Sequence, residues 1–195
     1  MVISDSEMQE IKDHFPELPK EKEARYQKEY GLAIYDAQII ASSKSMADFF
    51  DAAVQKTKNY TLLSNWLIGE ISAFLNKEII EINESKLSTE NVAVLINRID
   101  DQTISGKIAK SIFEEMCSSG ESPDQIIESK GLKQITDDDS IEKVVDEVIA
   151  NNPGQVEGYQ SGKDKLFGFF VGQVMKETQG KANPQTVNKI LKEKL

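Results

Sequence analysis

The chain has 195 residues, of which 39% are hydrophobic, and a formal net charge of −10. This composition is sufficient for a globular core, and no apolar run approaches the ~20 residues of a membrane-spanning helix. The single cysteine, Cys117, excludes an internal disulfide and a cysteine-built zinc site, and the acidic start lacks the features of a signal peptide, so we expect a soluble cytoplasmic protein.

The chain begins with a lead-in of weak periodicity at residues 1–18. Its only histidine, His14, has no cysteine or carboxylate cluster beside it, which is typical of a surface or turn residue rather than a metal ligand. Pro19 then begins a charged helix, and Gly31 stands where a left-handed residue commonly ends one.

Helical periodicity continues through the middle of the chain. Residues 34–54 predict one broken helix or two short ones, and residues 59–77 predict a stronger helix. Trp66 falls on the apolar stripe of that helix, which favours a core residue over a stacking platform. Ser88 is expected to cap the helix that follows it.

The helix expected after Ser105 carries the cysteine. Ser105-Gly106-Lys107 resembles a phosphate loop only in composition, and Ser105 is more simply a helix cap. Cys117 adjoins the apolar side of this helix and has no histidine nearby in sequence to activate it. These features predict an inert, half-buried thiol rather than a nucleophile.

A second group of short helices follows residue 120. Ser122 and Pro123 fit a capping box with proline at the first helical position, and Gly131 ends that helix. Residues 131–137 are a candidate extended segment. Asp139 is expected to cap the next helix, which is a simpler role for the acidic residues there than metal binding, and Asn152-Pro153 repeats the cap-and-proline pattern.

The last elements are two amphipathic helices within residues 163–195. Gly168 and Gly172 stand four residues apart on the first of them. Each glycine costs a helix about 1 kcal/mol relative to alanine, so the pair indicates that another group approaches closely. Asn183-Pro184 is expected to cap and begin the final helix.

The recurring helical period and the scarcity of alternating strands predict an all-α protein. We expect three parts: the lead-in at 1–18, a larger helical domain at 19–122, and a small helical tail domain at 123–195. The stretch at 118–123 is the candidate hinge.

No constellation of catalytic residues is recognisable in the sequence. It has neither a Walker-type phosphate loop nor a Gly-rich dinucleotide fingerprint, and its one histidine and one cysteine are far apart. We therefore expect no catalytic, cofactor-binding or metal-binding residues in this chain.

Positive charge gathers at the carboxyl end, where residues 163–195 hold seven lysines against three carboxylates. Two interpretations stay open from the residues alone: solubilising lysines on exposed helix faces, or contacts to phosphate groups. The candidate phosphate-binding residues are Lys163, Lys165, Lys176, Lys181, Asn183, Lys189, Lys192 and Lys194.

Several stretches resemble a known family. The strings GFFVGQVMKETQGKANPQTVNKILKEKL, ISGKIAKSIFEEM and GLKQITD are similar to the carboxyl-terminal part of the B subunit of aspartyl/glutamyl-tRNA amidotransferase, the GatB/YqeY family. FPELPKEKEARYQKEYGLAIYDAQIIASSKSMADFF resembles the segment immediately before that part. The resemblance covers the chain from about residue 15 to residue 195.

The resemblance implies a helical domain followed by a YqeY-like tail that helps to hold tRNA. In this family the complete B subunit, with the A and C subunits, converts Glu-tRNA(Gln) and Asp-tRNA(Asn) to Gln-tRNA(Gln) and Asn-tRNA(Asn) with ATP and Mg²⁺. The catalytic amino-terminal half has no counterpart here, so ATP and Mg²⁺ are expected only for the full-length protein and not for this fragment.

The resemblance raises phosphate binding above the solubilising interpretation of the lysines. We expect lysines and helix amino-termini to engage phosphates and riboses rather than to read bases. The alternative is a helical protein-interaction module that docks a partner subunit, through the face of Gly168 and Gly172 or the acidic first domain, without touching RNA.

Overall fold

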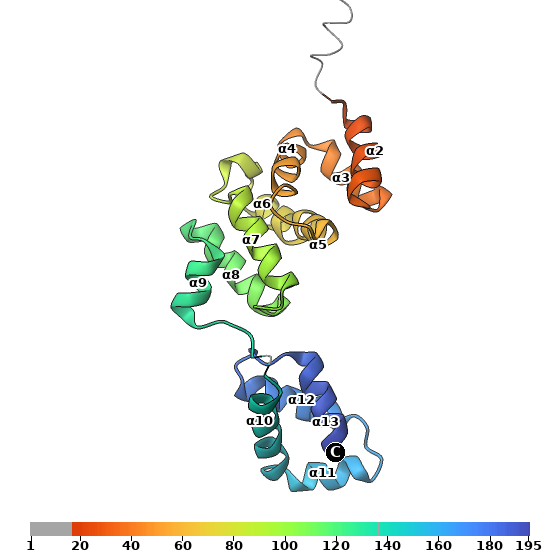
Figure 1. The fold of residues 1–195 in the computed structure, drawn as a ribbon, viewed down its shortest axis with the longest axis vertical. Helices are drawn as coiled ribbons and strands as arrows, with labels where there is room; N and C mark the ends of the chain where they lie inside the picture. Colours follow the sequence, from red (N-terminus) through yellow and green to blue (C-terminus); the bar gives the residue numbers. More distant parts are fainter. Residues whose placement is uncertain (1–16, 136) are drawn as a thin grey trace, which may run out of the picture. The chain divides into compact units, whose positions relative to one another are not determined.

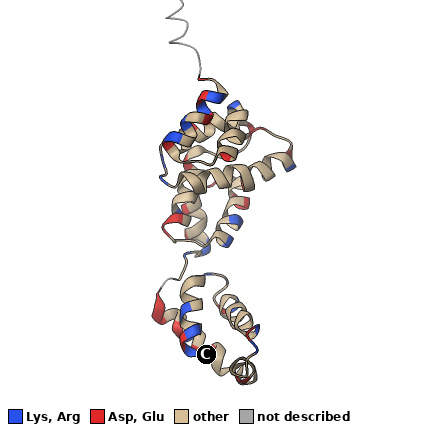
Figure 2. Cartoon of the chain, turned by 90° about the vertical axis from the view of Figure 1, so that its right-hand side faces the viewer, with Lys and Arg blue, Asp and Glu red and all other residues tan. Residues whose placement is uncertain are grey.

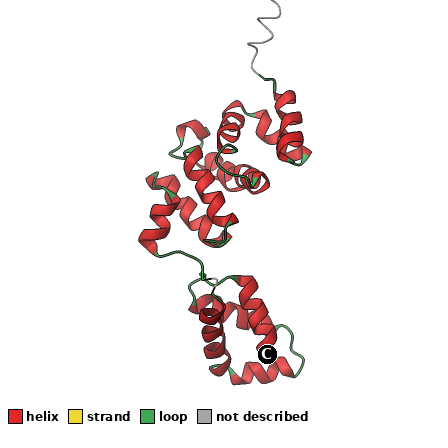
Figure 3. Ribbon diagram, in the orientation of Figure 1, coloured by secondary structure: helices red, strands yellow, loops and turns green. Residues whose placement is uncertain are grey.

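The computed structural model describes residues 17–135 and 137–195, and within them the regular structure is helical, with no strand (Figure 3). The prediction of an all-α protein is thereby confirmed. The chain divides into two compact units, residues 1–85 and 86–195. Most of the expected lead-in at 1–18, including His14, lies outside the described residues.

The first unit begins with helices α2 (Pro19–Tyr30), α3 (Ile34–Ser42) and α4 (Lys44–Ala53), shown in red to orange in Figure 1. Gly31 ends α2 with φ 67°, as its sequence position predicted. Ser43 separates α3 from α4 because its hydroxyl accepts a hydrogen bond from the Met46 backbone N–H. Of the two alternatives for this region, two short helices are therefore correct.

The strong helix expected at 59–77 is present, with a π-helical segment inside it. It consists of α5 (Tyr60–Trp66), η1 (Leu67–Ile71) and α6 (Ser72–Glu78), and the Asn59 side chain caps its start. Trp66 is 7% exposed, which confirms that it belongs to the core. A short 3₁₀ helix, η2 (Ile82–Glu84), follows.

The first unit has an aromatic core bordered by ion pairs. Tyr26 and Phe50 are fully buried and pack edge to face, with ring centroids 4.8 Å apart. Beside them, the Arg25 guanidinium lies 2.7 Å from the Glu17 carboxylate and 2.9 Å from that of Asp51. Together these groups attach α2 to α4.

The second unit begins with α7 (Thr89–Asp100), α8 (Gly106–Ser119) and α9 (Pro123–Lys130), which pack on one another. The predicted caps at their starts are confirmed: serine hydroxyls accept from the Asn91, Ile108 and Gln125 backbone N–H groups. Cys117 is half-buried on α8, as expected.

The remaining helices form what we call the tail bundle: α10 (Asp138–Ala150), α11 (Pro153–Gln160), α12 (Leu166–Glu177) and α13 (Pro184–Lys194). Helices α10, α12 and α13 pack pairwise around one apolar core. Its buried residues are Ile141, Val145, Val148, Phe170, Val174, Ala182, Val187, Ile190 and Leu191.

Two predicted caps in this region are wrong. Asp137 rather than Asp139 caps α10, because its carboxylate accepts from the Ser140 backbone N–H at 2.9 Å. Asn152 occupies the cap position of α11, but its side-chain amide instead donates to the Val148 carbonyl at 2.7 Å. At α10, neighbouring aspartates offer the same cap, and the local sequence does not decide between them. At α11, the Asn152 amide bonds back to the end of α10 instead of capping the helix that it precedes.

The candidate extended segment contributes one isolated parallel bridge between Ile135 and Ala182. The Ile135 N–H donates to the Lys181 carbonyl at 2.7 Å, and the Asn183 N–H donates to the Ile135 carbonyl at 3.0 Å. These bonds join the segment before α10 to the turn before α13. The described residues that pack on the tail core begin at Ile135.

The division of the chain at residues 122/123 stays a prediction. Helix α9, which that division assigns to the tail domain, packs against α7 and α8.

Candidate nucleic-acid interface

Asn183 lies at the start of α13, and both polar atoms of its side-chain amide form hydrogen bonds. Its Oδ1 accepts from the Gln185 and Thr186 backbone N–H groups at 2.9 and 3.2 Å. Its Nδ2 donates to Gln102 Oε1 at 3.2 Å, and the residue is 8% exposed. Two of the backbone donors expected to receive a phosphate are thus occupied by the cap itself.

Helix α13 lies against α10 with the two helices parallel, and ion pairs mark their register. Lys189, in the middle of α13, lies 3.5 Å from Asp138 at the start of α10. Lys194, at the end of α13, contacts Glu142 at 2.7 Å and Asp146 at 2.5 Å. Figure 2 shows the acidic and basic residues side by side along this part of the chain.

These carboxylates change the electrostatics of the lysines. A hydrogen bond to Asp146, which has the larger effect, and another to Glu142 raise the pKa of the Lys194 ammonium above its ordinary value. Lys189 and Asp138 are both more than half exposed, so their pair at 3.5 Å is weak and screened by salt. Two of the seven candidate lysines therefore already face carboxylates.

The other five candidate lysines have no ion pair within the described part of the chain. Lys163 and Lys165 precede α12, Lys176 is in its last turn, and all three are exposed. Lys181 is half-buried in the turn before α13, and Lys192 is exposed in the last turn of α13. These positions lie at both ends of α12 and at both ends of α13.

The positive charge of the carboxyl end is offset within its own bundle. Residues 137–195 contain eight lysines and ten carboxylates, a net of −2, because α10 and its cap add most of the acidic groups. The lysine-rich segment identified in the sequence is therefore packed against an acidic helix. The local potential at each lysine depends on its nearest neighbours rather than on the charge of residues 163–195.

The two glycines of α12 face open space. A Cβ added to Gly168 or Gly172 would meet no described atom within 4 Å, and both residues are exposed. The close approach predicted from their spacing is therefore not made by any described part of this chain. A tight approach occurs instead at Gly158, where a Cβ would lie 2.7 Å from Leu166 Cδ1.

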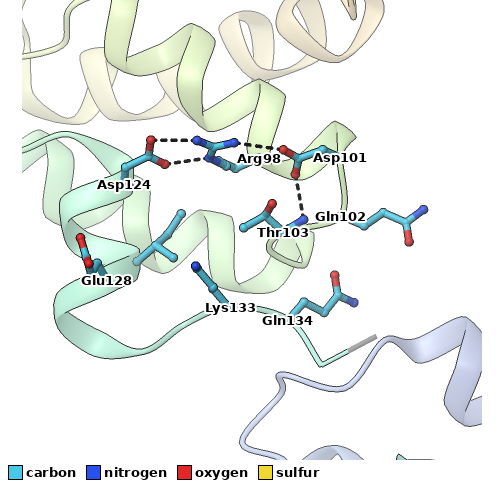
Figure 4. A pocket seen from close by; sticks show the side chains of 9 residues that line it. Arg98, Asp101, Gln102, Thr103, Asp124, Glu128, Lys133 and Gln134 are labelled. Carbon is cyan, nitrogen blue, oxygen red and sulfur yellow. Dashed lines mark hydrogen bonds and ion pairs between the residues drawn. The ribbon is translucent and has the colours of Figure 1, made fainter. Parts of the chain in front are cut away.

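A polar cleft of about 580 Å³ lies beside α7 and α9 in the second unit, and no pattern in the sequence indicated it. Figure 4 shows Arg98 between two carboxylates: Nε and Nη2 face Asp124 at 2.7 and 2.9 Å, and Nη1 faces Asp101 at 3.1 Å. Arg98 ties α7 to α9 through Asp124, while Asp101 at the end of α7 holds the other side of the guanidinium. Asp124 comes from another helix, so spacing alone could not have revealed this contact.

The described residues offer neither a metal site nor a membrane span. No group of three or more His, Cys, Asp and Glu side chains there has the arrangement to hold a metal ion. None of the helices in that part of the chain combines the length and apolar character needed to cross a membrane.

Comparison with known proteins identifies relatives along the whole chain. The B subunit of the aspartyl/glutamyl-tRNA(Asn/Gln) amidotransferase of Rickettsia rickettsii is 53% identical over 195 residues, which cover 100% of this chain and 40% of the relative. The corresponding protein of Hydrogenovibrio crunogenus is 50% identical, with 100% and 41% covered. That of Thioalkalivibrio sulfidiphilus is 52% identical over 194 residues, with 99% and 41% covered.

The chain thus spans about two fifths of the length of these curated relatives and aligns with their carboxyl-terminal part. A family model described as the GatB domain matches residues 48–195, which include the whole tail bundle and helices α5 to α9 before it. The chain therefore belongs to the GatB domain family, GatB_Yqey.

Proposed function

We propose that this chain is the tRNA-binding carboxyl-terminal region of the B subunit of a tRNA-dependent amidotransferase. The observation that carries the proposal is the 53% identity, over its full length, to a protein named for aspartyl/glutamyl-tRNA(Asn/Gln). The five candidate lysines without a described ion pair support it: four of them are exposed and Lys181 is half-buried, and unpaired ammonium groups are suited to phosphate contacts.

The reaction belongs to the proposal as well. The whole B subunit, with the A and C subunits, would convert Glu-tRNA(Gln) and Asp-tRNA(Asn) to Gln-tRNA(Gln) and Asn-tRNA(Asn) in the cytoplasm. We assign ATP, Mg²⁺ and catalysis to the part of the longer protein that this chain does not span. The role left to this chain is to hold the tRNA body.

Recognition would depend on shape and backbone. Lysines at both ends of α12, such as Lys163 and Lys176, carry flexible point charges that suit phosphates better than base edges. Three to five phosphate contacts would give a log–log slope of affinity against salt of about −2 to −5. Such binding is tolerant of sequence and sensitive to ionic strength.

The proposal is tested by titrating a tRNA(Gln) transcript into the 195-residue chain at about 50 and 200 mM salt. We expect affinity to fall steeply with salt. Lys163→Glu with Lys165→Glu should weaken binding by about tenfold or more, because two phosphate contacts become repulsive. Salt-independent binding, or no binding at either concentration, would contradict the proposal.

The matched control is Lys20→Glu with Lys28→Glu on α2. Both residues are exposed and without an ion pair in the described part of the chain, and the net charge changes by the same amount. This variant should retain nearly the affinity of the unsubstituted chain. Equal losses in the two variants would show that the overall charge, and not the tail bundle, governs binding.

A second candidate function for the first unit is docking a partner protein. Ile79 is 90% exposed and adopts φ 57°, a left-handed conformation that β-branched residues rarely occupy. Ile34 and Tyr35 are also more than half exposed. Co-purification of the chain with the A or C subunit, lost on Ile79→Asp but not on Lys28→Asp, would support this role.

A further inference from the structure

Helix α10 carries three carboxylates on one side, Asp138, Glu142 and Asp146, which we call the acidic row. The residues are four apart in sequence, so successive members are neighbours on one side of the helix, about 6 Å apart along its axis. All three bind lysines of α13 rather than lysines of their own helix.

The contacts pair this row with the basic side of α13. Asp138 faces Lys189, while Glu142 and Asp146 both contact the Lys194 ammonium. The Lys194 side chain is only 27% exposed. An incoming phosphate must therefore compete with carboxylates, which accept from the same charged donors: two of them at the Lys194 ammonium and one, more weakly, at that of Lys189.

The acidic row is not needed to hold the two helices together. Beneath it, Ile141 and Val145 of α10 share the fully buried core with Val187 and Leu191 of α13. Exposed ion pairs contribute little to stability by comparison with such a core. This leaves the row available for another role.

We propose that the acidic row is an intramolecular competitor of RNA, which occupies Lys189 and Lys194 in the free protein and lowers the affinity of the tail bundle for phosphates. This inference rests on the proposed tRNA binding and adds a regulation of it. Phosphates must displace the carboxylates to reach these two lysines, so tRNA binding is weaker and less dependent on salt than the number of lysines suggests.

The test neutralises the row while preserving its shape. Asp138→Asn/Glu142→Gln/Asp146→Asn should bind a tRNA(Gln) transcript about tenfold more tightly at about 100 mM salt. The slope of log affinity against log salt should become steeper by about 1.5, because two more phosphates are contacted. The far-ultraviolet circular dichroism of the variant should match that of the unsubstituted chain, since the apolar core is intact.

The matched control removes three other exposed carboxylates of the same bundle, by Asp139→Asn/Glu147→Gln/Glu157→Gln. These side chains form no ion pair with a lysine in the described part of the chain, and the change in net charge is identical. The affinity of this control for tRNA should increase by less than about threefold, through the change in overall charge alone. Equal gains in both variants would overturn the inference.

A double-mutant cycle gives the sharpest readout. Lys189→Ala/Lys194→Ala should lower the affinity for tRNA several-fold more in the neutralised variant than in the unsubstituted chain, because the carboxylates of the acidic row no longer compete for these ammonium groups. Equal losses in the two backgrounds would overturn the inference while leaving tRNA binding in place. Failure of every variant to bind tRNA would instead contradict the proposed function.

Discussion

At the scale of single residues, the Asn183 side chain at the start of α13 makes two kinds of contact. The oxygen of its amide caps α13, and the nitrogen reaches Gln102 in the turn after α7. A buried amide with both ends bonded stabilises one local arrangement. The Asn183 amide therefore has a structural role, and a phosphate contact by this residue stays a prediction.

This role predicts that Asn183→Ala lowers the free energy of unfolding by about 1 to 2 kcal/mol, because α13 loses its cap. Urea denaturation followed by circular dichroism measures the change. Asn188→Ala is the control, since Asn188 lies inside the same helix without a cap contact. That variant should be neutral or slightly stabilising, and equal losses in both would argue against the cap.

At the scale of elements, α12 combines a buried apolar face with an exposed face that carries two glycines. Phe170 and Val174 are fully buried, while Gly168 and Gly172 border open space. No described atom lies close enough to explain the glycines by packing within the chain. Their cost to the helix is therefore not compensated within the described part of the chain.

Gly168→Ala/Gly172→Ala should accordingly stabilise the chain by about 1 kcal/mol per site, through higher helix propensity and open surroundings. The midpoint of urea unfolding is the measurement. Gly120→Ala is the contrasting control, because Gly120 adopts φ 78° and alanine would be strained there. A loss of stability from the α12 pair would contradict the open surroundings.

The sequence predicted most elements but not the contacts between them. Serine, asparagine and proline marked the starts of α7 and α13, because a cap acts within four residues of its helix. The π-helical segment at Leu67–Ile71 left no local signature. The pairing of α10 with α13 depends on the register of two helices some fifty residues apart, which no periodicity encodes.

For the candidate site too, the sequence predicted the residues but not the contacts between them. The lysines are concentrated near the carboxyl end of the sequence, and their roles in binding stay a prediction. The sequence does not indicate which carboxylate lies beside each ammonium group: Lys194 faces Glu142 and Asp146, whereas Lys192 forms no ion pair with a described carboxylate. For that reason the net charge of a sequence segment differs from the charge that surrounds each lysine in the folded chain.

At the scale of the whole molecule, carboxylates held by cations link stability to pH. The Arg98 guanidinium lowers the pKa of Asp124, hydrogen bonding to Arg25 lowers that of Glu17, and hydrogen bonding to Lys44 lowers that of Asp48. A carboxyl whose pKa is lower in the folded state stabilises the protein above its unfolded pKa. That stabilisation is lost as the pH falls through the folded value.

We therefore expect the free energy of unfolding to be nearly constant from pH 7 to about 5 and to decrease below about pH 4, where these carboxyls become protonated. Asp124→Asn should lower stability at neutral pH and make the acid dependence shallower. Urea unfolding at a series of pH values is the measurement. An unchanged dependence in the variant would show that the Arg98 pair does not contribute to it.

The distance in sequence between α10 and its core partners has a consequence for synthesis on the ribosome. Ile141 and Val145 emerge about 50 residues before Leu191, a delay of roughly 3 to 10 seconds at ordinary elongation rates. During that interval the apolar side of α10 has no α13 to cover it. Asp138, Glu142 and Asp146 then lack their α13 lysines, so we expect the uncompensated negative charge of α10 to oppose association between neighbouring nascent chains.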